Sequence, residues 1–247
     1  MIKQLSIKLK NNNLSVRPCF DWGYQMYGYI CDILNPSIVE EIHQTMHTPF
    51  SQFLINSNGK DELEWRISIL DSSVDMMDGM LEIGNKIKLT KYNAELVITG
   101  KEISTISKRD FCKEYIIEGK SSRIKKVNIL TPASFKSDGE YMIFPTSNLI
   151  INSALSKWNS VMGKYNIDDE NAIGELMESC KIVGYKLKSI DYLLKGVKIP
   201  GFVGELTLKL SGNPRVMCLN SMLIDFLEFS GLGIKSALGM GACVVKR

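Results

Sequence analysis

The sequence has 247 residues, with 30 Lys and Arg against 27 Asp and Glu, and 45% of its residues are hydrophobic. This allows one large domain or two small ones with a real core, and the absence of an apolar run of about 18 residues argues against a membrane span. The N-terminal stretch lacks an apolar signal-peptide core, and the six scattered cysteines have no zinc-like spacing, which favours free thiols in a reducing cytoplasm.

Apolar periodicity in the first half predicts a mixture of strands and helices. The second predicted helix has start signals at Asn35 or Ser37, and Pro49 ends it by residue 48. The predicted elements are a strand at 2–10, helices at 22–34 and 35–48, strands at 50–56 and 63–70, a helix at 72–87 and a strand at 94–103.

The second half repeats this rhythm after a polar, basic stretch at 118–126 that reads as a linker. Its predicted elements are a strand at 125–134, a helix at 148–162, strands at 181–190 and 204–212, an amphipathic helix at 213–230 and a strand at 239–247. The sequence therefore predicts an α+β protein of two tandem ferredoxin-like (RRM-like) domains, 1–118 and 119–247.

Both histidines of the chain lie in "HQTMHTPFS", residues 43–51. Histidine is the side chain whose ordinary pKa, about 6.5, suits proton transfer near neutral pH. If the helix continues through His47, then His43 and His47 lie one turn apart on one face. The pair is also compatible with a polar helix surface. A zinc pair would need further ligands, and no metal site is predicted.

A glycine-rich stretch, "GLGIKSALGMG" at 231–241, lies between the last predicted helix and strand. It fits neither a Rossmann nor a Walker A motif. Its glycines would let backbone N–H groups approach phosphates beside the cation of Lys235. A tight helix-to-strand connection that needs positive φ angles explains the same pattern, and both interpretations stand.

Positive charge is concentrated towards the C-terminus. Residues 181–247 contain ten Lys and Arg against four Asp and Glu. This imbalance favours a polyanion partner, although a solvated basic surface has the same composition.

The G-x-G-x(5)-G-x-G loop beside the last strand resembles the signature of the CRISPR repeat-RNA endoribonucleases, the "Cas six" family of the RAMP superfamily. Further stretches are similar in the same order, so that the resemblance covers nearly the whole chain. They are the Tyr-rich "YQMYGYICDIL", the pair Ile42-His43, the strand start Pro49-Phe50-Ser51, "NILTPASF" and "IPGFVGELTLKLSG".

The resemblance implies metal-independent cleavage of CRISPR precursor RNA within its repeats, by 2′-OH attack, leaving a 2′,3′-cyclic phosphate and a 5′-OH. It implies no cofactor, and the partner it implies is CRISPR repeat RNA, as precursor and as mature guide. Other subunits of a type I surveillance complex are a further expected partner in this antiviral defence. We expect a cytoplasmic monomer or homodimer.

The resemblance also implies a catalytic site in which His43 is the central proton-transfer residue. The tyrosine and lysine of a Tyr/His/Lys triad fall on Cys31 and Thr48 in this sequence. Tyr27, one turn before Cys31, would then supply the phenol, and His47 would replace the lysine.

The expected RNA contacts come from the glycine-rich loop and from basic strands or linkers, because the aromatic RRM signature is not found. The candidates are Gly231, Gly233, Lys235, Ser236, Gly239, Gly241, Arg123, Lys125, Lys126, Lys186, Lys188 and Lys209.

Two alternative functions remain at this stage. A non-catalytic RNA-binding scaffold subunit of a guide-RNA complex would keep the fold and the glycine loop without cleaving RNA. A small-molecule-binding α+β protein would have no affinity for RNA.

Overall fold

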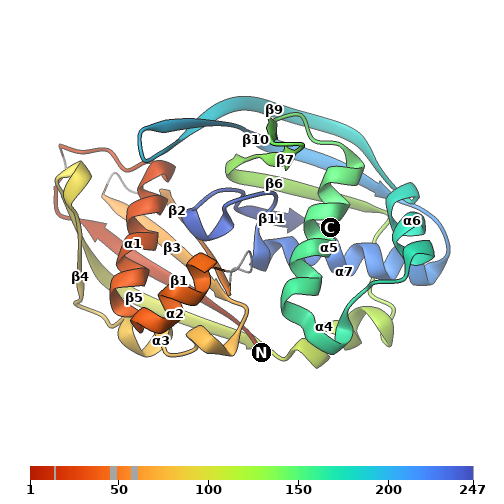
Figure 1. The fold of residues 1–247 in the computed structure, drawn as a ribbon, viewed down its shortest axis with the longest axis horizontal. Coiled ribbons are helices and arrows are strands. Elements are labelled where there is room, and N and C mark those ends of the chain that lie inside the picture. Colours follow the sequence, from red (N-terminus) through yellow and green to blue (C-terminus); the bar gives the residue numbers. More distant parts are fainter. Residues whose placement is uncertain (14, 45–48, 57–60, 247) are drawn as a thin grey trace. The chain divides into compact units, whose positions relative to one another are not determined.

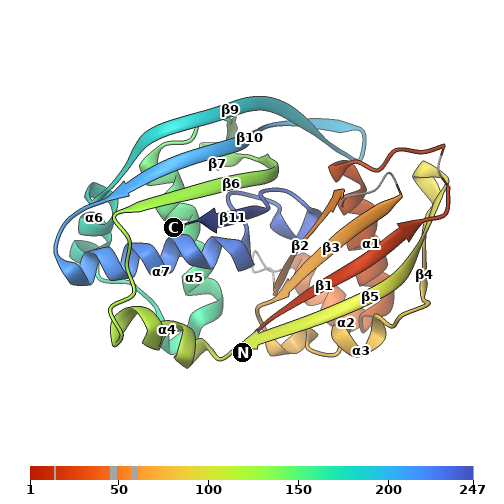
Figure 2. The same ribbon diagram turned by 180° about the vertical axis from the view of Figure 1, so that it is seen from behind.

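The computed structural model describes residues 1–13, 15–44, 49–56 and 61–246, and for His43 the backbone alone. The chain forms two compact units (Figures 1 and 2). Unit 1 comprises residues 1–105 and 235–239, and unit 2 comprises residues 106–234 and the C-terminal residues from 240. Within the described residues, every helix is too short or too polar to cross a lipid bilayer.

Unit 1 has a five-stranded sheet in the order β2-β3-β1-β5-β4. The first four strands of this order have the arrangement of a ferredoxin-like sheet, and β4 adds an edge. The elements are β1 (Ile2–Asn11), α1 (Gly23–Ile33), α2 (Pro36–Gln44), β2 (Phe50–Asn56), β3 (Glu62–Ile69), α3 (Met77–Met80), β4 (Lys86–Leu89) and β5 (Ala94–Ile106).

Alternation of side chains explains how this sheet buries one face. Leu5, Ile7 and Leu9 of β1 are fully buried, whereas Lys8 and Lys10 between and after them are exposed. The helices α1, α2 and α3 cover one face of the sheet, and Figure 2 shows the strands in front of them. The apolar side of α1 closes this core.

The helix predicted at 72–87 is wrong in this unit. The structure has a 3₁₀ turn at Ser72–Val74, the four-residue α3 and then β4 from Lys86. Gly84 has a φ of 95°, a left-handed conformation that stops a right-handed helix. The apolar residues of this stretch are buried by the sheet instead of by one long helix face.

Unit 2 has a four-stranded sheet in the order β11-β6-β10-β9, again ferredoxin-like. A small hairpin, β7–β8, precedes its first long helix. The elements are α4 (Lys108–Ile116), β6 (Ile124–Ala133), β7 (Phe135–Ser137), β8 (Glu140–Met142), α5 (Ser147–Met162), α6 (Glu170–Glu178), β9 (Cys180–Leu194), β10 (Val197–Leu210), α7 (Pro214–Ser230) and β11 (Cys243–Lys246).

The core of unit 2 lies between this sheet and helices α5 and α7. The rings of Trp158 on α5 and Phe226 on α7 meet edge to face at 5.2 Å. The side chain of Asn213 caps α7 by accepting from the N–H of Val216, and Pro214 starts the helix. These two residues fix the start of the helix predicted at 213–230.

Helix α4 falls within residues 106–118, which the sequence analysis assigned to the first domain. Phe111 of α4 packs its ring 6.2 Å from that of Phe226 on α7. The hydroxyl of Tyr115 donates to the buried carboxylate of Asp225, also on α7. These contacts explain why the structure groups residues 106–118 with unit 2.

Candidate active site and nucleic-acid interface

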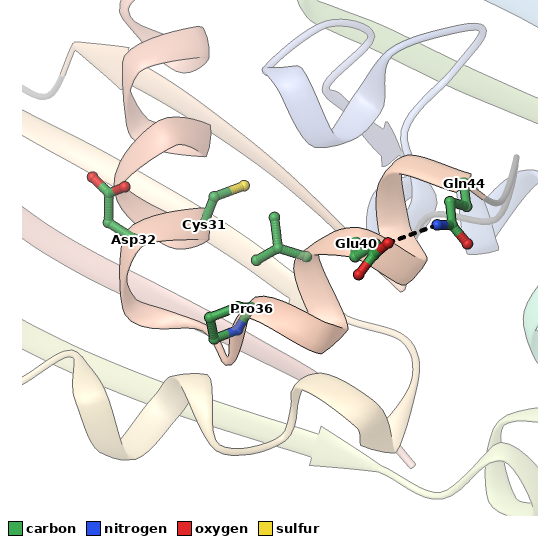
Figure 3. Close-up of a pocket in the computed structure, with 6 residues that line it drawn as sticks. Cys31, Asp32, Pro36, Glu40 and Gln44 are labelled. Atoms are coloured by element: carbon green, nitrogen blue, oxygen red, sulfur yellow. Dashed lines mark hydrogen bonds between the residues drawn. The ribbon is translucent and has the colours of Figure 1, made fainter.

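An open groove of about 560 Å³ lies in unit 1 beside α1 and α2. Cys31 and Asp32 line it from the end of α1, and Pro36, Val39, Glu40 and Gln44 line it from α2 (Figure 3). The amide of Gln44 donates to the carboxylate of Glu40 at 3.0 Å, one helical turn away. The α1 wall of the groove therefore has a thiol and one carboxylate, and the α2 wall has apolar side chains, a second carboxylate and an amide.

His43 belongs to the last turn of α2. It follows Glu40 by three residues and Val39 by four, the spacing that places residues on one side of a helix. The backbone therefore places His43 on the same side of α2 as these two lining residues. His47, the second candidate, lies outside the described residues, as does Thr48.

Tyr27, the predicted source of the phenol, lies on α1 against the start of β2. Its ring stacks on that of Phe50 at 6.1 Å, and the side chain is nearly buried. Burial, and then a hydrogen bond with the Cys31 thiol, raise the pKa of the Tyr27 phenol, so that it stays protonated at neutral pH. This position argues against direct contact of Tyr27 with RNA. Desolvation likewise raises the pKa of the half-buried Cys31 thiol, which favours its neutral form at neutral pH.

The stem of the glycine-rich loop in unit 2 is built from tight backbone approaches. A Cβ on Gly233 would lie 2.2 Å from the carbonyl oxygen of Ser134, and one on Gly241 would lie 1.9 Å from that of Leu232. The N–H of Gly241 donates to the carbonyl of Pro132. The two glycines are therefore required by packing and by positive φ angles of 78° and 68°.

These contacts also occupy the backbone donors of the stem. The N–H groups of Leu232, Gly233 and Ile234 each donate to an oxygen atom of unit 2. The sequence allowed two interpretations of the glycines, a phosphate-binding loop of backbone N–H groups and a tight helix-to-strand connection. The occupied N–H groups favour the tight connection. Gly231 is the C-cap of α7. Gly239 is the C-cap of the following 3₁₀ turn, Ser236–Leu238.

The tip of the loop, residues 235–239, is part of unit 1. The buried side-chain amide of Gln52 on β2 donates to the carbonyl of Ala237 at 2.9 Å. Lys235 adopts a left-handed conformation with φ 58°, and its side chain and that of Ser236 are half-exposed. Ile234 and Leu238 are half-exposed as well, so Lys235 and Ser236 are the polar side chains of the loop that a ligand could reach.

Four of the predicted lysines share one face of the unit 2 sheet. In an antiparallel pair, directly opposite residues lie on the same face. The register places Lys126 opposite Thr207, and Lys209 two residues further along β10. Lys186 lies opposite Glu205, and Lys188 opposite Val203. All four lysines are exposed.

The same register adds two cations that the sequence analysis missed. Lys181 lies opposite Lys209 on β9, and Lys246 lies opposite Lys126 on β11. Both are exposed. We call these six residues the lysine face: Lys126, Lys181, Lys186, Lys188, Lys209 and Lys246. The sequence shows the alternation of side chains within each strand, which places each lysine on one of two faces. It does not show the pairing register, which decides which lysines share a face.

Lys125 is a correction to the predicted RNA contacts. It is 1% exposed, and its ammonium group lies 2.6 and 2.7 Å from the two carboxylate oxygens of Asp225. Because neighbouring residues of a strand face opposite sides, Lys125 points to the helices and Lys126 away from them. Lys125 is thus a buried ion-pair partner within unit 2. Arg123, just before β6, is exposed.

Among the described residues, no three His, Cys, Asp or Glu side chains gather as ligands of a metal ion would. The cysteines of the chain are free thiols, four of them buried.

The paired ferredoxin-like sheets, the glycine-rich loop and the lysine face define a tandem ferredoxin-like protein. Residues 127–243 match the family model of the CRISPR-associated endoribonuclease Cas6. A Cas6 endoribonuclease of Streptococcus thermophilus is 28% identical over 226 residues, 91% of each chain. One of Mycobacterium tuberculosis is 24% identical and covers 91% of this chain and 71% of the relative.

Solved structures agree with this fold. A Cas6 product complex superposes with a TM-score of 0.80 at 20% identity over the full length of both chains. Thermus thermophilus Cas6 gives 0.74 at 18% identity, covering 100% of this chain and 98% of the other. The predicted α+β fold of two ferredoxin-like domains is confirmed. In sequence and in fold the chain is thus similar to CRISPR-associated Cas6 endoribonucleases.

Proposed function

We propose that this protein is an endoribonuclease that cuts CRISPR precursor RNA within its repeats, without a metal ion, and so yields mature guide RNAs. The observation that carries this proposal is the match to named Cas6 endoribonucleases over 91% of the chain. The lysine face and the groove beside α2 are compatible with an RNA substrate.

The proposed reaction uses the RNA's own 2′-OH as nucleophile. A base removes the 2′ proton, the 2′ oxygen attacks the adjacent phosphorus, and the bond from phosphorus to the 5′ oxygen breaks. An acid gives a proton to that 5′ oxygen. The products are a 2′,3′-cyclic phosphate and a 5′-OH, and each proton transfer is worth about 10²–10⁴-fold in rate.

We assign the proton transfers to His43 and His47. Imidazole exchanges protons near neutral pH, which the lysines of this chain do not do at their ordinary pKa of about 10.4. Tyr27, whose ring is nearly buried against Phe50, is not assigned a proton transfer.

RNA binding is assigned to the lysine face, to Arg123 and to the half-exposed side chains of the loop tip, Lys235 and Ser236. Ammonium groups on an uncovered sheet face neutralise phosphates and release counterions, so affinity falls steeply with salt concentration. Lys125 is excluded from this set because it is buried.

A non-catalytic scaffold is the second candidate function. Cys31 in the place of the family's tyrosine favours it, because desolvation raises the pKa of this half-buried thiol and so disfavours the thiolate at neutral pH. A scaffold would hold repeat RNA as tightly as the enzyme and leave it uncut.

The deciding experiment incubates the protein with labelled repeat RNA in EDTA. The RNA is transcribed from a CRISPR array of the source genome. A second strand carries a single 2′-deoxy substitution at the mapped cut. We expect a discrete product with the normal strand and no product with the deoxy strand. Tight binding without product would support the scaffold, and cleavage of the deoxy strand would overturn the 2′-OH mechanism.

A further inference from the structure

The base of the glycine-rich loop is bonded to helix α5, which crosses α7 in unit 2 (Figures 1 and 2). The amino group of Lys157 on α5 donates to the carbonyl oxygens of Ser230 and Gly231, at 2.9 Å each. One turn earlier on α5, the hydroxyl of Ser153 accepts from the N–H of Gly233 at 2.8 Å. Residues four apart lie on one side of a helix, so one side of α5 meets both the carbonyls and the N–H of this short stretch.

The two carbonyls that Lys157 meets lie at the end of α7. The last carbonyl groups of a helix have no partner within the helix, and a Lys or Arg side chain of the last turn often meets them. The last turn of α7 contains no basic residue. Lys157 therefore supplies, from another helix, the donor that the end of α7 lacks.

A lysine at this position costs free energy of desolvation. The side chain is only partly exposed, and desolvation lowers the pKa of Lys157 to about 7. A methionine would fill the same space without this cost. What the lysine adds is the pair of bonds to carbonyl oxygens, which fixes the direction of the backbone where the chain leaves α7.

The stem of the loop has two arms with different anchors. We call residues 231–234 the outgoing arm and residues 240–242 the return arm. In the return arm, the N–H of Gly241 donates to the carbonyl of Pro132 on β6. The N–H of Leu232 joins the arms by donating to the carbonyl of Gly241. The bonds to α5 come from the outgoing arm, which is the arm that leads to Lys235 and Ser236.

Lys235 follows Gly233 by two residues. Two residues of chain span at most about 7 Å, so the direction of the backbone at Gly233 limits where the side chain of Lys235 can lie. Along the chain, Lys235 lies between two anchored residues, Gly233 at Ser153 and Ala237 at Gln52. A hydrogen bond from an ammonium group to a phosphate needs a distance of about 2.7–2.9 Å, so a small shift of the arm is enough to lose it.

We propose that Ser153 and Lys157 are positioning residues for RNA binding, because they hold the outgoing arm on α5 and thereby place Lys235 against a phosphate of the RNA. Neither side chain contacts RNA itself. This proposal rests on the RNA-binding role proposed above for Lys235. In the alternative, purely structural role, the same bonds stabilise unit 2 and RNA affinity does not depend on them.

The test measures the affinity of repeat RNA by filter binding at several salt concentrations. Ser153→Ala removes the acceptor of the Gly233 N–H, and Lys157→Met removes the donor but keeps an unbranched apolar side chain. Each change is made alone and together with Lys235→Ala. Ser156→Ala is the control, because Ser156 is exposed on the same helix.

We expect Ser153→Ala and Lys157→Met each to weaken RNA affinity at least about twofold, the smallest coupling usual within one hydrogen-bond network. The slope of log affinity against log salt should become shallower by up to about 0.7–0.9, the share of one phosphate contact. Serine carries no charge, so a shallower slope in Ser153→Ala reports the displaced Lys235. In the Lys235→Ala background neither change should weaken binding further, and Ser156→Ala should bind as the original protein does.

Hydrogen exchange of the free protein follows the arm without RNA. Ser153→Ala should speed exchange in a peptide that covers residues 231–234, because the N–H of Gly233 loses its acceptor. A peptide from β10 should exchange as before. Thermal unfolding checks that each variant is folded under the conditions of the binding assay.

Losses of affinity that add to that of Lys235→Ala, or single variants with normal affinity and an unchanged salt slope, would overturn the proposal in favour of the purely structural role. Normal affinity of Lys235→Ala would overturn it as well, since no phosphate contact would depend on the arm. The cleavage assay in EDTA separates these results from the proposed activity. Uncut repeat RNA with the coupling intact would remove the enzyme and leave the positioning role.

Discussion

The side-chain amide of Gln52 donates a hydrogen bond of 2.9 Å to the carbonyl of Ala237, 185 residues away in the sequence. The same nitrogen donates to the carbonyl of Gly23 at 2.8 Å. The amide oxygen accepts from the indole N–H of Trp65 at 2.9 Å. A buried amide with these three bonds fixes the tip of the glycine-rich loop on β2 and at the start of α1.

Gln52→Leu should lower the free energy of unfolding by at least about 2 kcal/mol, because three buried polar partners lose a bond worth about 1–3 kcal/mol each when left unsatisfied. Urea unfolding measures this. Gln4→Leu is the matched control, since Gln4 makes one longer bond at the surface of the sheet, and it should change stability by less than about 0.5 kcal/mol. Equal effects of both changes would refute the role of Gln52.

His43→Ala should reduce the cleavage rate at least about 10²-fold with little change in RNA affinity, because it removes a proton-transfer group and no phosphate contact. Single-turnover cleavage and filter binding measure the two effects. In the unchanged protein, two titrating imidazoles predict a bell-shaped pH–rate profile, and His43→Ala or His47→Ala should each abolish one limb. Full activity of the His43→Ala variant would contradict the assignment of a proton transfer to His43.

Lys126→Ala and Lys209→Ala should weaken binding of repeat RNA and make its salt dependence shallower. Each lost phosphate contact removes about 0.7–0.9 from the slope of log affinity against log salt. Alanine substitution of Lys181 or Lys246, which the register adds to the lysine face, should have the same effect as substitution of Lys126 or Lys209. Lys113→Ala is the control, because Lys113 is exposed on α4 and paired with Glu118. An unchanged slope would remove the substituted lysine from the interface.

Gly241→Ala should destabilise the protein by at least about 2 kcal/mol, since a Cβ would lie 1.9 Å from a backbone oxygen and the φ of 68° is strained for alanine. Gly28 provides the contrast, because it lies in α1 and a Cβ there would meet nothing within 4 Å. Gly28→Ala should stabilise by about 0.5–1 kcal/mol. Thermal and urea unfolding compare the two, and a harmless Gly241→Ala would contradict the packing argument.

Stability should rise with pH above neutrality because of Lys157. Burial lowers the pKa of this residue to about 7, and its ammonium group donates to the carbonyls of Ser230 and Gly231 at 2.9 Å each. In the unfolded chain a lysine keeps its proton up to a pKa of about 10.4. Between these two values the unfolded state binds more protons, so the free energy of unfolding increases with pH.

Lys157→Met tests this directly. Urea unfolding at pH 7 and pH 8.5 should show a gain of about 1 kcal/mol per pH unit in the original protein, and the variant should lose that gain. Comparing the two proteins cancels the opposite trend from buried thiols such as Cys243, whose pKa is raised by burial. The same pH dependence in both would show that Lys157 keeps its proton in the folded state.

Local patterns in the sequence were sufficient for most of the fold. The alternation in β1, the Asn213-Pro214 cap of α7 and the apolar face of that helix each depend on neighbouring residues. The resemblance built on the glycine-rich loop and the strand starts was confirmed by the family match. The stretch predicted as a helix at 72–87 holds only short elements, and the unpredicted α4 is itself short; the burial of both depends on what packs against them.

The sequence by itself determined the resemblance to Cas6 endoribonucleases and the α+β, ferredoxin-like character of the fold, because these follow from motif order and periodicity along the chain. Only the tertiary structure decided which cations are available to a ligand and which side chains hold the glycine-rich loop. Lys125 and Lys126 are adjacent in the sequence, yet the strand register buries one beside Asp225 and exposes the other. Ser153 and Lys157 likewise reach the glycine-rich loop only because α5 lies beside the end of α7, and such long-range pairing is not encoded in any local pattern.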